Sequence, residues 1–123
     1  KLHNLDKKII LKVTNLEGIK DKYDIIISNP PYIDENEYKN LQLEIRKFEP
    51  KIALLGGRDG LKFYRLFAKK LENIMNKNSF FICEIGHKQL DCCKKIFSNS
   101  NLILKKISKD IQKIDRTLTF FKI

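Results

Sequence analysis

The sequence predicts a layered α/β fold whose sheet is mainly parallel. Short runs of apolar and β-branched residues alternate with longer segments in which apolar residues recur every three or four positions. Strands that alternate with helices in this way form a sheet covered by helices. The length of 123 residues and the apolar content of 42% suit one core, and the chain has no internal repeat. We therefore expect residues 1–123 to form a single domain.

Two strands are expected in the first third of the chain. Residues 9–14 (IILKVT) are rich in β-branched side chains, which favour extended structure. Residues 23–28 (YDIIIS) are an almost continuous apolar run, which is typical of a strand buried on both faces of a parallel sheet. This second strand must end at Pro30 and Pro31, because proline has no N–H to donate to a neighbouring strand.

The middle of the chain is expected to hold helices on both sides of a glycine-rich loop. A short amphipathic helix is predicted by the spacing of its apolar residues, which are Tyr38, Leu41, Ile45 and Phe48. Residues 51–60 are rich in glycine and predict a loop in which Asp59 is the candidate N-cap of the next helix. That helix has about four turns, and its apolar positions are Leu61, Tyr64, Ala68, Leu71 and Met75.

The last third of the chain is expected to add a strand, a helix and a hairpin. Residues 79–85 (SFFICEI) are a second apolar run, which Gly86 closes. A helix follows at the spacing of Leu90, Cys93 and Phe97. Residues 102–107 and 117–123 predict two strands, and the polar turn between them indicates an antiparallel hairpin.

Composition argues against several kinds of function. No stretch approaches the roughly 18–20 apolar residues that span a bilayer, and no signal segment is visible, so a cytoplasmic protein without membrane contact is expected. The net charge is +10, but the basic residues are mostly scattered lysines, which argues against a dedicated nucleic-acid surface. The three cysteines lack metal-ligand spacing, so reduced thiols and no metal site are expected. His3 and His87 are expected at the surface.

The main functional signal is the turn Asn29-Pro30-Pro31-Tyr32, called here the Asn-Pro-Pro-Tyr turn, at the end of the strand 23–28. Ligands of parallel sheets bind at the carboxyl ends of the strands. The Asn29 amide oxygen is a neutral acceptor, and the two prolines hold their carbonyls stiffly without adjacent N–H donors. Tyr32 adds a flat aromatic face. This set fits a planar group that carries an –NH2, since two acceptors can hold both hydrogens and orient the nitrogen toward an electrophile.

The residues around this turn resemble a known family. The segment Asp24-Ile-Ile-Ile-Ser-Asn-Pro-Pro-Tyr-Ile33 is similar to the signature of amino-methyltransferases. Further motifs have the order found in the HemK/PrmC family, and they are Phe48-Glu49-Pro50, Ala53-Leu54, Gly56-Gly57-x-Asp59-Gly60-Leu61 with Tyr64, Glu84-Ile85-Gly86-x-x-Gln89, and Asp110 with Asp115-Arg116. That family methylates the glutamine of the Gly-Gly-Gln motif in peptide-chain release factors, with S-adenosyl-L-methionine as the methyl donor.

The resemblance implies a role for each residue of the turn. Asn29 and the carbonyl of Pro30 would hold the glutamine amide and would act as the catalytic pair. Pro31 and Tyr32 would complete the substrate pocket. Asn29 would also lie near the methyl donor. Glu84 is expected to order the neighbouring loop rather than to act as a base.

The resemblance also implies a cofactor site and a fold. Asn15 and Leu16 match positions that line the adenine side of the S-adenosylmethionine site, although many relatives carry Asp where this chain has Asn15. The fold would be the C-terminal portion of a Rossmann-like methyltransferase domain, because the family's glycine-rich cofactor loop has no counterpart here. We therefore expect weak or no cofactor binding by this chain alone, and an exposed edge at the strand 23–28. The expected partners are the release factor and the missing N-terminal half.

Two other hypotheses remain open. The signature segment is shared with adenine-N6 methyltransferases of nucleic acids, which would be expected to carry a target-recognition region that the sequence does not reveal. A non-catalytic remnant of a truncated gene is the alternative from another functional class.

Overall fold

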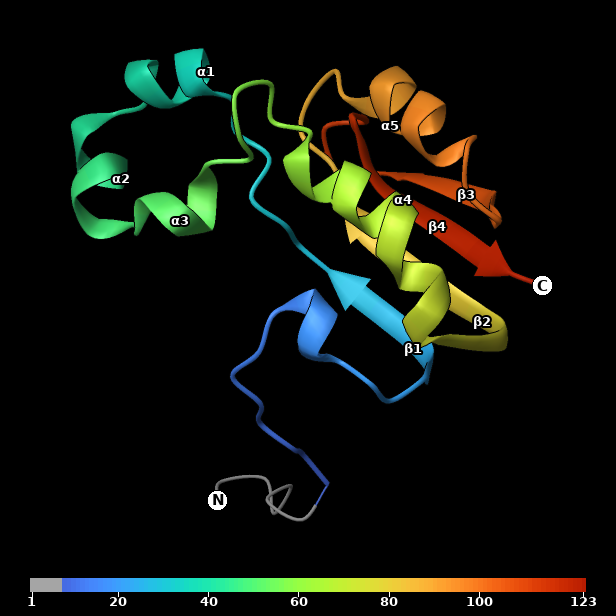
Figure 1. The fold of residues 1–123 in the computed structure, drawn as a ribbon. Helices are drawn as coiled ribbons and strands as arrows, with labels where there is room; N and C mark the ends of the chain where they lie inside the picture. The colour runs from blue at the N-terminus through green and yellow to red at the C-terminus, as the bar shows by residue number, and fades with distance from the viewer. Residues whose placement is uncertain (1–7) are drawn as a thin grey trace.

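The computed structural model describes residues 8–123, so the segment 1–7 with His3 lies outside the described residues. A sheet with the strand order β1-β2-β4-β3 forms the centre (Figure 1). Its strands are β1 (Tyr23–Ser28), β2 (Met75–Glu84), β3 (Leu102–Lys109) and β4 (Asp115–Lys122). β1 is parallel to β2, whereas β4 is antiparallel to both β2 and β3. The α/β class and the C-terminal hairpin are confirmed, and the sheet is mixed, with its parallel pairing between β1 and β2.

The helices lie close to the expected positions, with three shifts in their bounds. They are η1 (Leu16–Gly18), α1 (Glu35–Asn40), α2 (Leu43–Phe48), α3 (Lys51–Leu54), α4 (Lys62–Ile74) and α5 (Leu90–Phe97). The single helix expected over 38–48 is split, because Leu41 has extended backbone angles at the end of α1. The spacing of apolar residues conceals this break, since α1 and α2 keep the same spacing. In addition, α3 lies in the expected loop, and Met75 begins β2 rather than ending α4.

The strand expected over residues 9–14 is absent from the described structure, so this prediction is wrong. Residues 9–15 have no regular secondary structure. Ile10, Leu11 and Val13 are 81%, 91% and 108% exposed. β-branched side chains favour a strand only where they can pack against a neighbouring strand and a partly buried surface. None of the described strands pairs with this segment.

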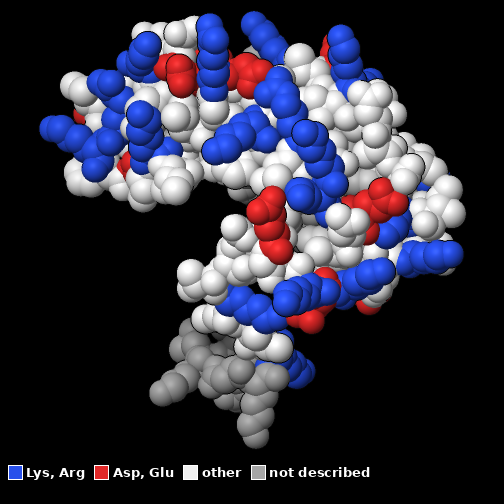
Figure 2. Space-filling view, in the orientation of Figure 1, with Lys and Arg blue, Asp and Glu red and all other residues white. Residues whose placement is uncertain are grey.

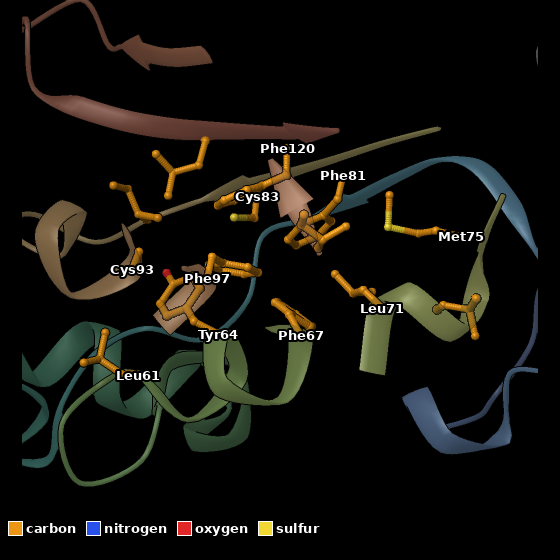
Figure 3. Close-up of a cluster of buried hydrophobic side chains, with 14 residues drawn as sticks. Leu61, Tyr64, Phe67, Leu71, Met75, Phe81, Cys83, Cys93, Phe97 and Phe120 are labelled. Carbon is orange, nitrogen blue, oxygen red and sulfur yellow. The ribbon is translucent and has the colours of Figure 1, made fainter. Parts of the chain in front are cut away.

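The core lies between one face of the sheet and the helices α4 and α5. Phe81 of β2 is fully buried, and its ring centroid lies 5.3 Å from that of Phe67 in α4 and 6.0 Å from that of Phe120 in β4. Phe97 of α5 completes this aromatic cluster, at 4.2 Å from Phe120 (Figure 3). This packing fixes the carboxyl ends of β1 and β2, which are neighbours in the sheet.

The opposite face of the sheet is open. Ile25 and Ile27 of β1 are 59% and 74% exposed, and Phe80 of β2 is 39% exposed. The expectation that residues 23–28 form a strand buried on both faces is therefore wrong for this chain, whereas β1 is an edge strand as the resemblance implies. No helix among the described residues is long and apolar enough to cross a membrane.

Replacing Lys122 by methionine is expected to destabilise the fold by about 1–3 kcal/mol. The Lys122 ammonium donates to the carbonyls of Glu72 (2.6 Å) and Met75 (2.9 Å) at the end of α4. Bonds from a charged donor to helix-end carbonyls contribute roughly this much. The midpoint of urea unfolding measures the effect, and Lys106→Met on exposed β3 is the control. Equal midpoints for the two variants would contradict the assigned role.

Candidate functional site

The Asn-Pro-Pro-Tyr turn lies where β1 ends, at the edge of the sheet that also holds the carboxyl end of β2 (Figure 1). A cavity of about 150 Å³ lies beside it, lined by residues 29–33 and by Ala53 and Leu54 of α3. Figure 2 shows the surface hollowed between the lobe of α1–α3 and the segment of β1. The structure thus brings all the turn residues named from the sequence to one cavity. The wall supplied by α3 had no predicted role.

The acceptors of the turn are available to a ligand. Asn29 is exposed and Pro30 is buried. Among residues 8–123, no hydrogen bond involves the Asn29 side chain or the carbonyls of Pro30 and Pro31. Asn29, Pro30 and Pro31 all line the cavity, and their side-chain and carbonyl oxygens are the kind of acceptors expected for a group that carries two N–H hydrogens.

Backbone hydrogen bonds hold α3 beside the turn. Ile33 N–H donates to the Leu54 carbonyl at 3.1 Å, and Gly56 N–H donates to the Ile33 carbonyl at 2.8 Å. Ile33 and Leu55 therefore form an isolated parallel bridge. Because this bridge begins at the first residue after the turn, it fixes the turn relative to the α3 wall of the cavity.

The Tyr32 side chain connects the turn to the end of β2. Its hydroxyl donates to Glu84 Oε1 at 2.8 Å, while the Tyr64 hydroxyl of α4 donates to the Glu84 carbonyl at 3.1 Å. Burial raises the pKa of Tyr32 above its ordinary value, and the bond to Glu84 adds to this shift. Tyr32 is therefore a neutral donor at pH 7. Glu84 orders the turn, in agreement with the loop-ordering role expected from the sequence.

Gln89 is a site residue to which the sequence assigned no role, although the motif Glu84-Ile85-Gly86-x-x-Gln89 contains it. Its Nε2 donates to the Tyr32 carbonyl at 2.9 Å, and its Oε1 accepts from Gly86 N–H at 2.9 Å. Behind this contact, Arg116 donates to Asp110 at 3.1 Å and to the Ile85 carbonyl at 3.4 Å. The loop after β2 is thereby tied both to the turn and to the β3–β4 hairpin.

Asn15 and Leu16 lie apart from this cavity, at the start of η1. Asn15 Oδ1 accepts from Gly18 N–H at 2.9 Å and so caps η1, and Leu16 packs against the core. The cap leaves the Asn15 side-chain N–H2 available as a donor for an acceptor nitrogen of a ligand. The cavity of about 150 Å³ is smaller than the roughly 300–1,000 Å³ of sites that enclose a whole ligand. The cavity beside the Asn-Pro-Pro-Tyr turn is therefore too small to enclose a complete cofactor.

The remaining reactive side chains do not form a second centre among the described residues. No group of three His, Cys, Asp or Glu residues that could hold a metal ion occurs between residues 8 and 123. Burial raises the pKa of the Cys93 thiol to about 12, and burial also raises the pKa of Cys83. Cys92 and His87 are exposed. In the space-filling view, Lys and Arg side chains spread over several elements of the visible face (Figure 2).

The carboxyl group of Asp59 is expected to titrate near pH 2. Its Oδ1 accepts from Leu61 N–H at 3.2 Å, in the loop that leads into α4. Leu61 is the N-cap of α4, so Asp59 stabilises this loop and is not the N-cap that the sequence predicts. The hydrogen bond from Arg65 lowers the pKa of Asp59 to about 2. Since the folded pKa is depressed, the small stabilisation is present above pH 4 and is lost as the pH falls toward 2.

Carbon-13 NMR titration of the Asp59 carboxyl group measures this pKa. Arg65→Gln is expected to move it upward toward 3.8, the ordinary value of an aspartate, whereas the exposed control Arg46→Gln leaves it unchanged. A normal pKa in the unsubstituted chain would contradict the ion pair.

Comparison with known sequences gives a consistent set of relatives. No family model matches the chain. The chain is 35% identical over 124 residues to the bifunctional methyltransferase of Rickettsia felis, covering 100% of this chain and 24% of that protein. It is 33% identical to the release factor glutamine methyltransferase of Fusobacterium nucleatum, covering 93% and 35%. The counterpart in Clostridium acetobutylicum is 35% identical over 98 residues, covering 80% and 34%.

Solved structures support the fold. A methyltransferase from Pyrococcus furiosus has a TM-score of 0.56 at 19% identity, covering 85% of this chain and 43% of that one. A release-factor-specific protein-(glutamine-N5) methyltransferase from Alicyclobacillus acidocaldarius has a TM-score of 0.52 at 24% identity, covering 82% and 49%. The chain spans about a third or less of the curated relatives named above. By sequence homology, it belongs to the release factor glutamine methyltransferase family and corresponds to a part of those proteins.

Proposed function

We propose that this chain provides the methyl-acceptor half of an active site that methylates the glutamine of the Gly-Gly-Gln motif in peptide-chain release factors. The observation that carries the proposal is the cavity beside the Asn-Pro-Pro-Tyr turn, with free acceptors at Asn29, Pro30 and Pro31. Relatives named release factor glutamine methyltransferase support the choice of a glutamine amide. Because the chain spans only part of those relatives, the complete activity requires sequence beyond it.

Each residue of the turn has a specific task in this proposal. The Asn29 side-chain oxygen and the Pro30 carbonyl accept the two amide hydrogens of the substrate glutamine, which aligns the nitrogen lone pair with the methyl donor. The same acceptors stabilise the positive charge that develops on that nitrogen. Pro31 and the Tyr32 ring restrict the amide plane. As the nitrogen–carbon bond forms and the sulfur–carbon bond breaks, the nitrogen becomes positively charged while it still carries both of its hydrogens. It then releases one of these hydrogens as a proton to water, so the step needs no protein base and Glu84 can stay bonded to Tyr32.

S-adenosyl-L-methionine, when bound, supplies a methyl group that is already activated on a sulfonium. In this chain Asn29 would lie nearest to that methyl group, and Asn15 and Leu16 would contact the adenine side. We expect this chain alone to bind the cofactor with a dissociation constant weaker than micromolar, because its cavity is too small to enclose the whole molecule. Isothermal titration calorimetry measures the affinity. Micromolar binding would contradict this expectation.

The proposal is tested on the acceptor side by NMR of the labelled chain. A Gly-Gly-Gln peptide amide is expected to shift the Asn29 side-chain and Tyr32 ring resonances, whereas the Gly-Gly-Glu peptide, which lacks the –NH2 group on that side chain, leaves them unchanged. Asn29→Ala removes the response, and Asn36→Ala, in exposed α1, preserves it. Binding of adenosine in place of the peptide would favour the adenine-N6 alternative. No response to either ligand would favour a non-catalytic remnant.

A further inference from the structure

Gln89 joins three separate backbone segments through one side chain. Besides its 2.9 Å bonds to the Tyr32 carbonyl and to Gly86 N–H, its Nε2 lies 3.4 Å from the Gly60 carbonyl. These partners belong to the turn after β1, the loop before α4 and the loop after β2. All three segments meet at the carboxyl edge of the sheet.

The side chain of Gln89 does not serve its own helix. Gln89 is the N-cap residue of α5, but its side chain makes no capping hydrogen bond to that helix. An N-cap side chain ordinarily accepts from an N–H of the first turn. Here the amide is directed away from α5, toward Tyr32 and Gly60, so helix stability does not explain its orientation.

Few side chains hold the turn. Pro30 and Pro31 have no N–H, and among the described residues the side chains that bond to the turn are those of Glu84 and Gln89. Glu84 reaches the distal Tyr32 hydroxyl, whereas Gln89 reaches the Tyr32 backbone itself. Gln89 therefore holds the carbonyl of the Tyr32–Ile33 peptide unit, and the N–H of this unit donates to the Leu54 carbonyl at 3.1 Å.

Glycines make the close approach of Gln89 to the turn possible. A Cβ at Gly60 would lie 2.3 Å from the Tyr32 carbonyl oxygen and 2.7 Å from Gln89 Nε2. A Cβ at Gly86 would lie 2.7 Å from Gln89 Oε1 and 2.9 Å from a ring carbon of Tyr32. Any larger residue at either position would have to displace the Gln89 side-chain amide or the turn. The contact between Gln89 and the turn therefore requires glycine at both positions.

We propose that Gln89 is a positioning residue for the methyl-acceptor site, which holds the Tyr32 peptide so that the Pro30 and Pro31 carbonyls stay at the cavity. By occupying the Tyr32 carbonyl, Gln89 also removes this oxygen as a competing acceptor for the substrate amide. The inference rests on the proposed function, since it assigns Gln89 to the same site.

The test replaces Gln89 by glutamate, with Gln112→Glu as the matched control. Gln112 is exposed in the β3–β4 turn, so the control makes the same change of charge without the contact. In Gln89→Glu, the oxygen that replaces Nε2 faces the carbonyls of Tyr32 and Gly60 and cannot donate when ionised. Protonation of this glutamate at pH 4 restores an O–H donor at the same place. The hydrogen bond to the Tyr32 carbonyl can therefore be removed and restored in one variant by changing the pH.

Binding of the Gly-Gly-Gln peptide amide is measured by NMR at pH 8 and pH 4. Gln89→Glu is expected to weaken binding by about tenfold at pH 8, the loss of roughly one hydrogen bond, and to recover at pH 4. The Tyr32 carbonyl carbon shift, which reports its hydrogen bond without any ligand, is expected to change and recover in parallel. Gln112→Glu and the unsubstituted chain are expected to show neither effect.

The outcomes separate the two proposals. Failure of the unsubstituted chain to bind the peptide overturns the proposed function. Normal binding by Gln89→Glu at pH 8, or a weakening that persists at pH 4, overturns the positioning role alone. Circular dichroism verifies folding, and Gln89→Met provides an uncharged second variant. If both Gln89 variants are unfolded while Gln112→Glu is folded, Gln89 serves the stability of the whole domain and the positioning role is also overturned.

Discussion

Alanine in place of Gly60 is expected to lower the free energy of unfolding by more than about 2 kcal/mol and to displace the Asn-Pro-Pro-Tyr turn. Gly60 has a φ of +73°, in the left-handed region, where a side chain costs about 1–2 kcal/mol. Its new Cβ would also lie 2.3 Å from the Tyr32 carbonyl oxygen. That oxygen belongs to a backbone held by Gln89 and cannot rotate away, so overpacking adds about 1–3 kcal/mol.

Gly18→Ala is the matched control for this substitution. Its Cβ would also meet an atom at 2.3 Å, but that atom is the hydroxyl of Thr14, an exposed side chain that can rotate. The glycines with a positive φ among the described residues are Gly57 and Gly60, so Gly18 adds no backbone strain of this kind. Urea unfolding and the Tyr32 ring resonances are therefore expected to change in Gly60→Ala and to stay close to normal in Gly18→Ala. Similar losses in both variants would show that the overlap at Gly60 is relieved locally.

The place of the Asn-Pro-Pro-Tyr turn at a strand end could be predicted because its signal is contiguous in the sequence. An apolar run followed by Asn29-Pro30-Pro31-Tyr32 specifies a strand end, stiff carbonyls and an aromatic face without any knowledge of distant contacts. The strand 23–28, the helix that carries Leu90, Cys93 and Phe97, and the C-terminal hairpin could be predicted for the same reason. In each of these elements, the secondary structure that the local sequence pattern favours is the one that the fold contains.

The support of the turn could not be predicted, because it depends on contacts between distant segments. Gln89 is 57 residues from Tyr32 in the sequence. A loop-ordering role was expected for Glu84, but its partner Tyr32, 52 residues away, could not be identified from the sequence. The same limitation explains the error at residues 9–14, where strand propensity is present but no described strand pairs with the segment. Strand propensity is a property of the local sequence, whereas a strand also needs a neighbouring strand with which to pair. Residues 9–14 have the propensity but no such neighbour among the described residues.

The open face of the sheet shows a related effect of missing neighbours. Ile25 of β1 pairs with Phe80 of β2, which pairs with Phe121 of β4, and Phe121 pairs with Ile103 of β3. This row of apolar side chains crosses the whole sheet, and Ile25, Phe80 and Ile103 are 59%, 39% and 40% exposed. Such a row is expected on a face that another layer covers, and α4 and α5 pack on the other face. In this chain the row and the free edge of β1 are both available to a second copy.

The chain is therefore expected to self-associate, and Ile27→Lys is expected to raise the concentration of half-association by about tenfold or more. Ile27 lies on the edge strand β1 and is 74% exposed. Burial of an isoleucine contributes about 1.5–3 kcal/mol, and a lysine placed in the interface removes this gain and adds repulsion between copies. Sedimentation velocity over a range of protein concentrations measures the shift. Ile111→Lys is the matched control, because Ile111 is 101% exposed in the β3–β4 turn, outside the strands. A monomeric chain at all concentrations, or equal shifts in the two variants, would show that the open face and edge of the sheet do not drive association.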